Sequence, residues 1–437
     1  MPRLGDGAHL AVRAALCEPT SVTREEPEKL GNQVLGSGFW RLWASSGLSN
    51  LADGAFKVAL PLVAIRFTDS PVLIAGLALA LSLPWLLFAL QAGALADRVD
   101  RRWAMLGANI ARASLIAVLV LAAGFGVGSI WVLYVVAFCV GIAETVYDTS
   151  AQSILPQLVS RDLLSRANGR LYAVELTANQ FLGPPLGGLL VAVGTVVAFA
   201  APAALWLAAV GALLLVRGNF RIEREGRTTM RADIAEGLRF LWRHRILRTL
   251  AIMTGVFNLA SNAMFAVFVL YAVGPRSAMG LTDPLFGVLL TATAAGSLVG
   301  SFLAERVERR LGRSRSLMVG IIGGAVLIGI PAITANPFVI GAAFFLGGLT
   351  IVIWNVITVS LRQRISPDRL LGRVNSGYRL VAWGTMPLGA AVGGVLAQFF
   401  GLPAVFAIAG IVTLALLLLM PILTDRALDA ADHNAAG

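Results

Sequence analysis

Long apolar runs follow one another along this chain, and short polar or charged segments separate them. Each run approaches the roughly 20 residues that a helix needs to cross a bilayer core of about 30 Å. The apolar positions are continuous rather than alternating, and Ala, Leu and Gly dominate them, which predicts helices and not barrel strands. The pattern predicts twelve spanning helices, at residues 38–66, 71–96, 103–124, 129–152, 168–193, 196–216, 248–273, 284–304, 316–335, 338–360, 376–400 and 403–423.

A charged turn that follows the second run returns in the second half of the chain. Residues 97–102 read Asp-Arg-Val-Asp-Arg-Arg, and residues 305–310 read Glu-Arg-Val-Glu-Arg-Arg, 208 positions later. Residues 163–168 recur in similar form at 370–375. Repeats at half the chain length indicate two similar halves. The predicted divisions are a tail at 1–37, a six-helix half at 38–216, a basic loop with an amphipathic helix at 217–247, a second half at 248–423 and a tail at 424–437.

Composition agrees with a membrane protein and excludes several other classes. The chain is 57% hydrophobic and 14% charged, whereas soluble domains carry about 25% charged residues. The net charge of +11 comes from arginines that lie between the apolar runs, as membrane topology requires, so no nucleic-acid partner is expected. Two cysteines and three scattered histidines predict neither a disulfide framework nor a metal site. No phosphate-binding loop or catalytic motif occurs, so we expect no enzyme and no cofactor.

The arginines also predict an orientation. The segments 97–102, 161–170, 217–248, 305–315 and 361–373 are basic, whereas the intervening loops are short and nearly neutral apart from Arg66 and Arg276. By the positive-inside rule, both termini and the central loop lie in the cytoplasm. Residues 233–242 have the pattern of an amphipathic helix at the inner membrane surface. The first 35 residues lack the apolar core of a cleavable signal peptide.

Two sets of six helices joined by a basic loop are typical of secondary transporters. Residues 93–102 resemble the major facilitator superfamily signature Gly-x-Leu-Ala-Asp-Arg-x-Gly-Arg-Arg, with Asp100 in place of the second Gly. That Asp, together with residues 59–62, 155–159 and 183–188, is similar to the macrolide and siderophore (enterobactin-type) exporter branch. The resemblance covers residues 38–423 and implies an all-α integral membrane fold whose two six-helix halves are related by pseudo-two-fold symmetry. The arginine-glutamine signature that many drug-proton antiporters carry in helix 4 is missing.

The resemblance implies a gate at the charged turn. In it, Asp97 pairs with Arg101 or Arg102 and faces the end of helix 11, so that the two halves lock together in one state. The alternative is that these charges only set topology. The predicted gating residues are Gly93, Asp97, Arg98, Arg101 and Arg102, with Glu305 and Arg309 in the second copy.

Four acids inside predicted spans are candidates for proton coupling: Asp53, Glu144, Asp148 and Glu175. An ionisable group at a helix centre costs roughly 2.5–3.5 kcal/mol on insertion scales, so it is expected to have a function. Alternatives remain for two of the sites. Asp53 could pair permanently with Lys57, four residues further on, and Glu144 with Asp148 could line a solvated vestibule. A fifth charge, Arg112, either extends to the inner interface or pairs with Asp97.

The helix 5 stretch Gly183, Pro184, Pro185, Gly187 and Gly188 matches an export-associated motif. Its prolines predict a kink and its glycines predict close helix packing. We expect a pivot against Pro387, Gly389, Gly393 and Gly394 of helix 11, with ordinary packing as the alternative. Polar and aromatic residues within the spans are candidates for substrate contact: Trp85, Tyr147, Asn179, Asn258, Asn262, Trp354, Asn355 and Trp383. Such a lining predicts a fairly large amphipathic ligand.

The sequence thus favours proton-coupled export of a hydrophobic or amphipathic small molecule, such as a drug, an antibiotic, a secondary metabolite or a siderophore. We expect rocker-switch alternating access in a monomer within the inner membrane of a bacterium, with the proton gradient as the energy source. Two alternatives remain open. One is a proton-coupled importer of a nutrient or chelate, and the other is a membrane scaffold or sensor that transports nothing.

Overall fold

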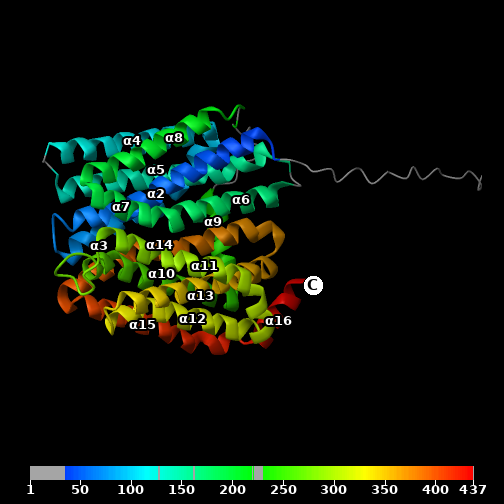
Figure 1. Cartoon of the computed structure of the whole chain (residues 1–437). Helices are drawn as coiled ribbons and strands as arrows, with labels where there is room; N and C mark the ends of the chain where they lie inside the picture. The colour runs from blue at the N-terminus through cyan, green and yellow to red at the C-terminus, as the bar shows by residue number, and fades with distance from the viewer. Residues whose placement is uncertain (1–34, 126–127, 161–162, 219, 221–229, 437) are drawn as a thin grey trace, which may run out of the picture. The chain divides into compact units, whose positions relative to one another are not determined.

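The computed structural model describes residues 35–125, 128–160, 163–218, 220 and 230–436. From Gly36 onward these residues form one compact unit, which is helical apart from turns and an isolated bridge between Val273 and Leu281. The predicted all-α fold is confirmed. Figure 1 shows the long helices running side by side, with the N-terminal half in blue to green and the C-terminal half in green to red.

The N-terminal half contains α2 (Ser37–Ala64), α3 (Pro71–Arg98), α4 (Arg101–Gly124), α5 (Ile130–Leu158), α6 (Leu164–Leu176), η2 (Thr177–Leu182), α7 (Gly183–Val193) and α8 (Thr195–Leu214). A connecting helix, α9 (Met230–Arg243), follows. The C-terminal half contains α10 (Arg245–Ala272), α11 (Asp283–Leu311), α12 (Arg313–Gly329), η3 (Ile330–Ala332), α13 (Pro337–Ile365), α14 (Asp368–Phe400), α15 (Leu402–Ala415) and η4 (Leu416–Ile422), and α16 (Asp425–Ala436) ends the chain.

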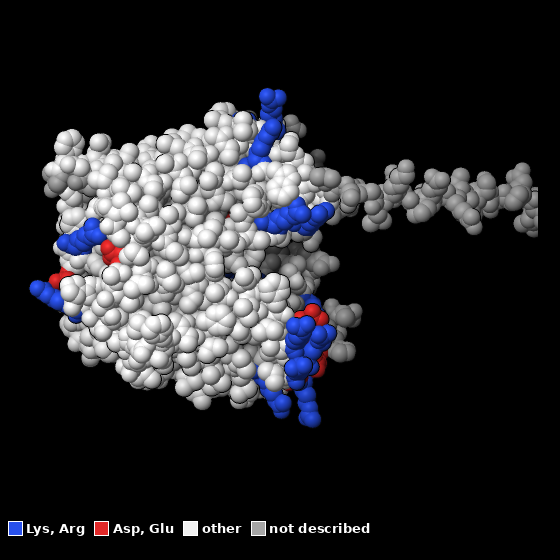
Figure 2. Space-filling view, in the orientation of Figure 1, with Lys and Arg blue, Asp and Glu red and all other residues white. Residues whose placement is uncertain are grey.

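Eleven helical segments of the described chain are long and apolar enough to cross a membrane. The twelfth predicted span is α2, which has 28 residues but a lower hydropathy because it carries polar side chains such as Asn50, Asp53 and Lys57. Figure 2 shows how the charged side chains are distributed over one face of the molecule. Lys and Arg side chains gather at the two ends of the helices, and a broad band without charges separates them.

Helix 5 is interrupted where the prolines predict a kink. The π-helical turn η2 separates α6 from α7, and Pro184 and Pro185 lie in the first turn of α7. A proline lacks an amide hydrogen, and its ring displaces the carbonyl four residues earlier, so the preceding turn widens. Those earlier positions, Gln180 and Phe181, lie within η2.

Glycines let α7 approach two other helices. Gly183 faces Gly54 of α2, and Gly187 faces the backbone of Ala55 one turn away. Gly188 instead packs on the backbone of Asp283 in α11, which belongs to the other half. A side chain at any of these positions would overlap the facing helix, so the contacts depend on the missing Cβ.

The helix 5 motif was expected to pack against the glycines of helix 11, and this predicted partner is wrong. Helix 5 meets α11, where Gly287 packs against the backbone of Pro184. In helix 11, Gly389 and Gly393 pack on α10, and Gly394 packs on Ala75 of α3. The reason is the repeat of the two halves. The helix 5 motif packs on α2, the first helix of its own half, and on α11 of the other half. The helix 11 glycines correspondingly pack on α10, the first helix of their own half, and on α3 of the other half.

The halves also meet through an ion pair at the end of the helices opposite the arginine-rich segments. Arg66, which follows α2, places Nη2 3.3 Å from Oδ2 of Asp283 at the start of α11. The same guanidinium donates to the hydroxyl of Thr195 and to the carbonyl of Val191. Arg66 therefore connects three helix ends across the two halves, which explains why a basic residue stands in an otherwise neutral loop.

At the arginine-rich end, basic side chains cap helices within the N-terminal half. Arg102 donates to the carbonyls of Leu213 and Leu214, and Arg41 donates to that of Leu215. These are the carbonyls of the last two residues of α8 and of its C-cap Leu215, where the helix dipole favours positive charge. In α9, Glu236 pairs with Arg373 of α14 and Leu241 is buried, so α9 packs on the start of α14. Its predicted position at the membrane surface stays a prediction.

We expect Gly188→Ala to separate α7 from α11. The added methyl would overlap the backbone of Asp283, and overpacking of this kind costs about 1–3 kcal/mol. Gly211→Ala in α8 is the matched control, because a Cβ at Gly211 meets no atom within 4 Å. Thermal unfolding in detergent should show a lower midpoint for the first variant only. Equal midpoints would contradict the assigned crossing.

Candidate functional site

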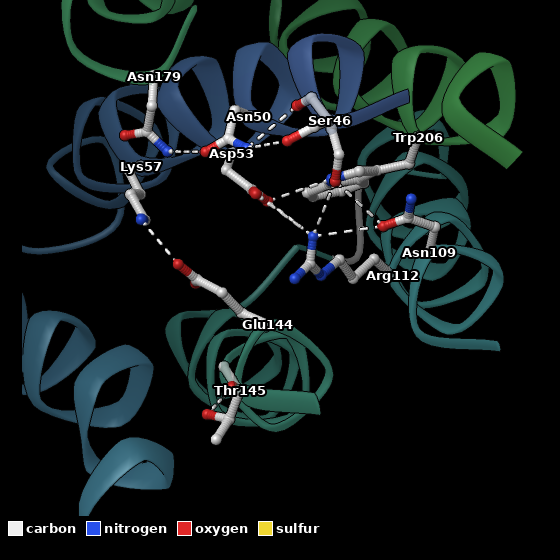
Figure 3. A network of polar contacts seen from close by, with 12 residues as sticks. Ser46, Asn50, Asp53, Lys57, Asn109, Arg112, Glu144, Thr145, Asn179 and Trp206 are labelled. Carbon is white, nitrogen blue, oxygen red and sulfur yellow. Dashed lines mark hydrogen bonds and ion pairs between the residues drawn. The ribbon is translucent and has the colours of Figure 1, made fainter. Parts of the chain in front are cut away.

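A cluster of charged side chains lies inside the N-terminal half. Helix α2 contributes Asp53 and Lys57, α4 contributes Arg112, α5 contributes Glu144, and α8 contributes Trp206 (Figure 3). These residues form two ion pairs that differ in exposure. The inner pair joins Asp53 to Arg112, and the outer pair joins Lys57 to Glu144.

The inner pair is fully enclosed. Nη1 of Arg112 lies 3.1 and 3.3 Å from the two carboxylate oxygens of Asp53, and the side chains are 0% and 4% exposed. The indole of Trp206 donates a third hydrogen bond to Asp53 at 3.1 Å. Two of the alternatives are therefore wrong: Asp53 forms no ion pair with Lys57, and Arg112 does not extend to the interface, because its guanidinium points into the half. The other alternative for Arg112 involves Asp97, whose side chain lies outside the described residues.

Further contacts fix the guanidinium of Arg112. Its Nη1 donates to Ser49 at 3.2 Å and to Asn109 at 3.3 Å, and it lies over the rings of Tyr147 and Trp206. Tyr147 is 1% exposed. It therefore packs on Arg112 in this conformation and presents no surface to a substrate.

The outer pair is more open. Nζ of Lys57 lies 2.8 Å from Oε1 of Glu144, and the Lys57 side chain is 37% exposed. Lys57 thus neutralises Glu144, whereas Asp148 lies one turn further along α5. Asp148 is half-buried, and no basic group of the described residues forms an ion pair with it.

Glu175 begins a second polar line across α2 and helix 5. The hydroxyl of Ser46 donates to Glu175 at 3.2 Å, and the amide of Asn50 donates to the carbonyl of Ser46. Asn179 continues the line, with its amide 3.3 Å from Oδ1 of Asn50 (Figure 3). Glu175 is half-buried and is hydrogen-bonded by a neutral group, so it can hold a proton or face a cation.

Several substrate candidates gather at a pocket in the C-terminal half. The pocket lies among α10, α12, α13 and α15, and its lining includes Asn258, Trp354 and Asn355. Trp354 donates to Thr254, and Asn258 donates to the carbonyl of Ala382. Asn262 donates to the backbone of Asn258, one turn earlier. Two other candidates meet between the halves: Trp85 and Trp383 form an edge-to-face pair with centroids 5.8 Å apart.

The predicted gate is described only in part. The side chains of Asp97 and Arg98, and the surroundings of Gly93, lie outside the described residues. Arg101 donates to the carbonyl of Ser153 in α5, a contact within the N-terminal half. In the second copy, Glu305 and Arg309 form an exposed pair on one helix, with N and O 3.4 Å apart, and such pairs contribute little to stability.

Sequence reasoning missed Trp206 and Arg379. Trp206 lies in a helix that reads as uniformly apolar, so nothing marked its hydrogen bond to Asp53. Arg379 seemed to lie near the edge of its span, but α14 begins at Asp368 and encloses it. Its guanidinium stacks on Trp383, 4.1 Å from the ring centroid. Among the described residues, no three His, Cys, Asp or Glu side chains could hold a metal ion together.

Two repeated helical halves, with charged groups buried between their helices, define a membrane transporter of the major facilitator fold. Residues 34–436 match the family described as "Transmembrane secretion effector", and the chain belongs to this family of the major facilitator superfamily. It is a multi-pass membrane transporter and not an enzyme.

Named relatives cover most of the chain. It is 28% identical over 372 residues to the multidrug efflux pump Tap of Mycolicibacterium fortuitum, covering 81% of this chain and 88% of that protein. Macrolide efflux protein A of Streptococcus pyogenes is 22% identical, covering 92% and 99%. Among solved structures, an inward-facing bacterial homologue of the iron transporter ferroportin has a TM-score of 0.69 at 18% identity, covering 92% and 100%. The nucleoside transporter NupG has a TM-score of 0.70 at 12% identity, covering 88% and 98%. These last two show the fold alone.

We expect single removal of either charge of the inner pair to destabilise the protein strongly. Arg112→Gln leaves Asp53 buried without its cation, and breaking such a pair costs about 3–5 kcal/mol. The double variant Asp53→Leu/Arg112→Met removes both charges and should lose much less stability than either single variant.

Thermal unfolding and the yield of folded protein in detergent measure the effect. Arg41→Gln is the control, because Arg41 only caps α8 at a more exposed position. If Arg112→Gln unfolds at the wild-type midpoint, the inner pair does not stabilise the half.

Proposed function

We propose that this transporter exports a hydrophobic or amphipathic small molecule in exchange for protons. One observation carries the proposal. Two half-buried acids, Asp148 and Glu175, lie within spanning helices, and Asp148 stands one turn from the Glu144 that Lys57 satisfies. An acid in a bilayer-spanning segment is costly, and it is retained where it serves an ion pathway. Reversible protonation is the chemistry that these two groups offer.

The arginine-rich end faces the cytoplasm in this proposal, and both termini lie there, in the inner membrane of a bacterium. The ion pair of Arg66 with Asp283 and the crossing of Gly188 then lie at the outer side. Halves that meet at the outer side are compatible with entry of a substrate from the cytoplasmic side. The transporter works as a monomer, with no cofactor besides the proton gradient and no nucleic-acid partner.

In this proposal the substrate class is inferred from the polar and aromatic side chains of the two halves. The N-terminal half offers carboxylates, whereas the C-terminal pocket offers the indole of Trp354, the ring of Phe257 and the amide of Asn355. Aromatic walls with few polar groups suit the apolar part of an amphipathic molecule. A drug, an antibiotic, a secondary metabolite or a siderophore could have this character.

Import of a nutrient or chelate is the second candidate, because the same fold serves both directions. The helix 5 motif and the efflux function named for Tap and for macrolide efflux protein A favour export. A scaffold or sensor that transports nothing is disfavoured, since such a protein gains nothing from the insertion cost of Asp148 and Glu175.

Proton coupling can be measured in inverted membrane vesicles. With an imposed pH gradient, acidic inside, wild-type vesicles should accumulate a fluorescent amphipathic probe such as ethidium. Asp148→Asn should abolish the gradient-driven part of uptake and leave downhill movement intact, and Glu175→Gln should reduce it. Glu305→Gln is the control, since Glu305 is an exposed acid at the arginine-rich end.

Two outcomes would contradict the proposal. Gradient-driven uptake that persists in both Asp148→Asn and Glu175→Gln would exclude these acids. Entry of the probe into whole cells, without accumulation in inverted vesicles, would favour the importer.

We also expect Trp354→Ala to weaken the binding of aromatic substrates selectively. Loss of one stacking indole in a pocket should raise the KM for ethidium by about tenfold, equivalent to roughly 1.4 kcal/mol. Trp131→Ala, at a 64% exposed position of α5, is the matched control and should leave KM unchanged. Concentration-dependent uptake in the same vesicles gives both values. A wild-type KM in Trp354→Ala would remove the pocket from the binding site.

A further inference from the structure

The pocket of the C-terminal half lies at the position that the enclosed ion pair occupies in the N-terminal half. Helices α2 and α10 both have 28 residues, α5 and α13 both have 29, and α8 and α15 both begin directly after a glycine. Residues at equal distances from the first residue of two such helices therefore correspond to each other. Close contacts agree with this register. Gly141 of α5 packs on the backbone of Leu81, and its counterpart Gly348 packs on that of Thr293, the counterpart of Leu81.

The surroundings of Arg112 correspond to the lining of the pocket. Three side chains that contact Arg112 have counterparts in that lining: Ser49 corresponds to Phe257, Tyr147 to Trp354, and Trp206 to Thr413. Arg112 itself corresponds to Gly324 of α12, where an added Cβ would stand 2.6 Å from the ring of Phe257. Phe257 thus fills the place of the arginine, whereas only the short side chain of Thr413 stands for the indole. The pocket corresponds to the space that Trp206 fills in the other half.

The pocket also differs from its counterpart in charge. Glu144 and Asp148 of α5 correspond to Ile351 and Asn355 of α13, which both line the pocket. No charged side chain is present among the described residues of the lining. A charge enclosed there would lose its water and find no counter-ion, which is strongly unfavourable. The group that this pocket accepts is therefore uncharged.

Most polar side chains of the lining already have hydrogen-bond partners within the protein. The hydroxyl of Thr254 accepts from the indole of Trp354, with donor and acceptor 3.3 Å apart. Asn258 and Thr413 donate to backbone carbonyls of α14 and α15. Because these polar groups are satisfied, the inner wall mainly offers the apolar surfaces of rings and aliphatic chains. Such a wall suits an aromatic ring.

Asn355 is the polar residue of the lining that remains available. It is exposed, and its amide has no hydrogen bond with the other residues that the structure describes. Ile321 of α12 and Thr413 of α15 are buried, whereas Phe257 of α10 and Trp354 of α13 are half-buried. The pocket is therefore closed toward α12 and α15 and opens between α10 and α13, where Asn355 lies. A primary amide can donate to a polar group and accept from it.

We propose that this pocket binds an uncharged aromatic ring of the substrate, in the place that the indole of Trp206 fills in the other half. Asn355 binds a polar substituent of that ring at the mouth. The inference rests on the proposed export and names the part of the amphipathic substrate that the C-terminal half recognises. The halves match in the arrangement of their helices, but one site is filled by its own side chains and the other by the ligand.

Equilibrium binding to the purified transporter in lipid nanodiscs tests the class of ligand, with empty nanodiscs as the blank. The probes 1-methylnaphthalene and N-methylquinolinium have nearly the same shape, and only the second carries a charge in its ring. Wild type should bind the uncharged probe at least about tenfold more tightly, because the charged ring would be buried without a counter-ion. Equal affinities for the two probes would contradict a site for an uncharged ring.

A filled pocket tests where the ring binds. Thr413→Trp restores the indole of the other half and should weaken the binding of 1-methylnaphthalene by at least about tenfold. Thr413→Leu fills the pocket in part and gives a second reading if the indole prevents folding. Thr413→Val is the control, because valine is nearly as large as threonine, and it should keep the wild-type affinity. Wild-type affinity in both filled variants would overturn the assignment of the pocket.

The role of Asn355 is measured with a second pair of probes. Asn355→Leu should weaken the binding of 2-naphthol about fivefold, as loss of one hydrogen bond would, and should leave that of naphthalene unchanged. Asn355→Gln keeps the amide and should keep part of the preference for 2-naphthol. If Asn355→Leu weakens both probes equally, the residue only shapes the pocket, and its assigned contact is wrong.

Vesicle uptake separates this inference from the proposed export. Thr413→Trp should raise the KM for ethidium, because the phenyl group of ethidium is an uncharged ring. If the binding results hold while wild-type vesicles show no gradient-driven uptake, the proposed export fails and the ligand class of the pocket stands. If wild-type uptake is present and its KM is unchanged in Thr413→Trp and Thr413→Leu, the pocket does not bind the substrate, and this inference fails while export stands.

Discussion

The enclosed ion pair between Asp53 and Arg112 is the constraint on which the N-terminal half depends. Two charges removed from water must satisfy one another, and a misplaced partner leaves an uncompensated charge in a medium that cannot solvate it. The pair fixes α2 against α4, and the indole of Trp206 adds α8. Because Asp53 is held there, Lys57 on the same helix faces α5 instead, where Glu144 receives it.

This arrangement divides the charges of the half into two groups. The enclosed group is almost fully buried, and its ion pair holds helices in register. In the outer group Lys57 is partly exposed, and Asp148 is half-buried one turn from Glu144. A rigid inner pair beside a less constrained outer one lets the half move as a body while a few side chains change their partners.

The sequence was enough to predict the helices, but it was not enough to predict which side chains form ion pairs or which helices pack together. Continuous apolar runs are a local signal, and the interruption before Pro184 follows from the chemistry of proline. The pairing of Asp53 with Arg112 joins positions 59 residues apart, and it depends on how α2 and α4 are rotated about their axes. Hydropathy does not encode that rotation. The helix 11 glycines were assigned the wrong partner for the same reason, since a small residue indicates a close approach without naming the helix that approaches.

The ion pair between Arg66 and Asp283 is sensitive to the salt concentration of the solution around it. Its guanidinium is 43% exposed, unlike the enclosed pair, so dissolved ions reach it directly. Charges in water are screened over about 8 Å at physiological ionic strength and over about 3 Å at 1 M salt. The strength of this contact is therefore set partly by the salinity of the solution at that end of the helices, whereas the enclosed pair of the same half is shielded from it. One face of the transporter responds to the composition of the environment, and its core does not.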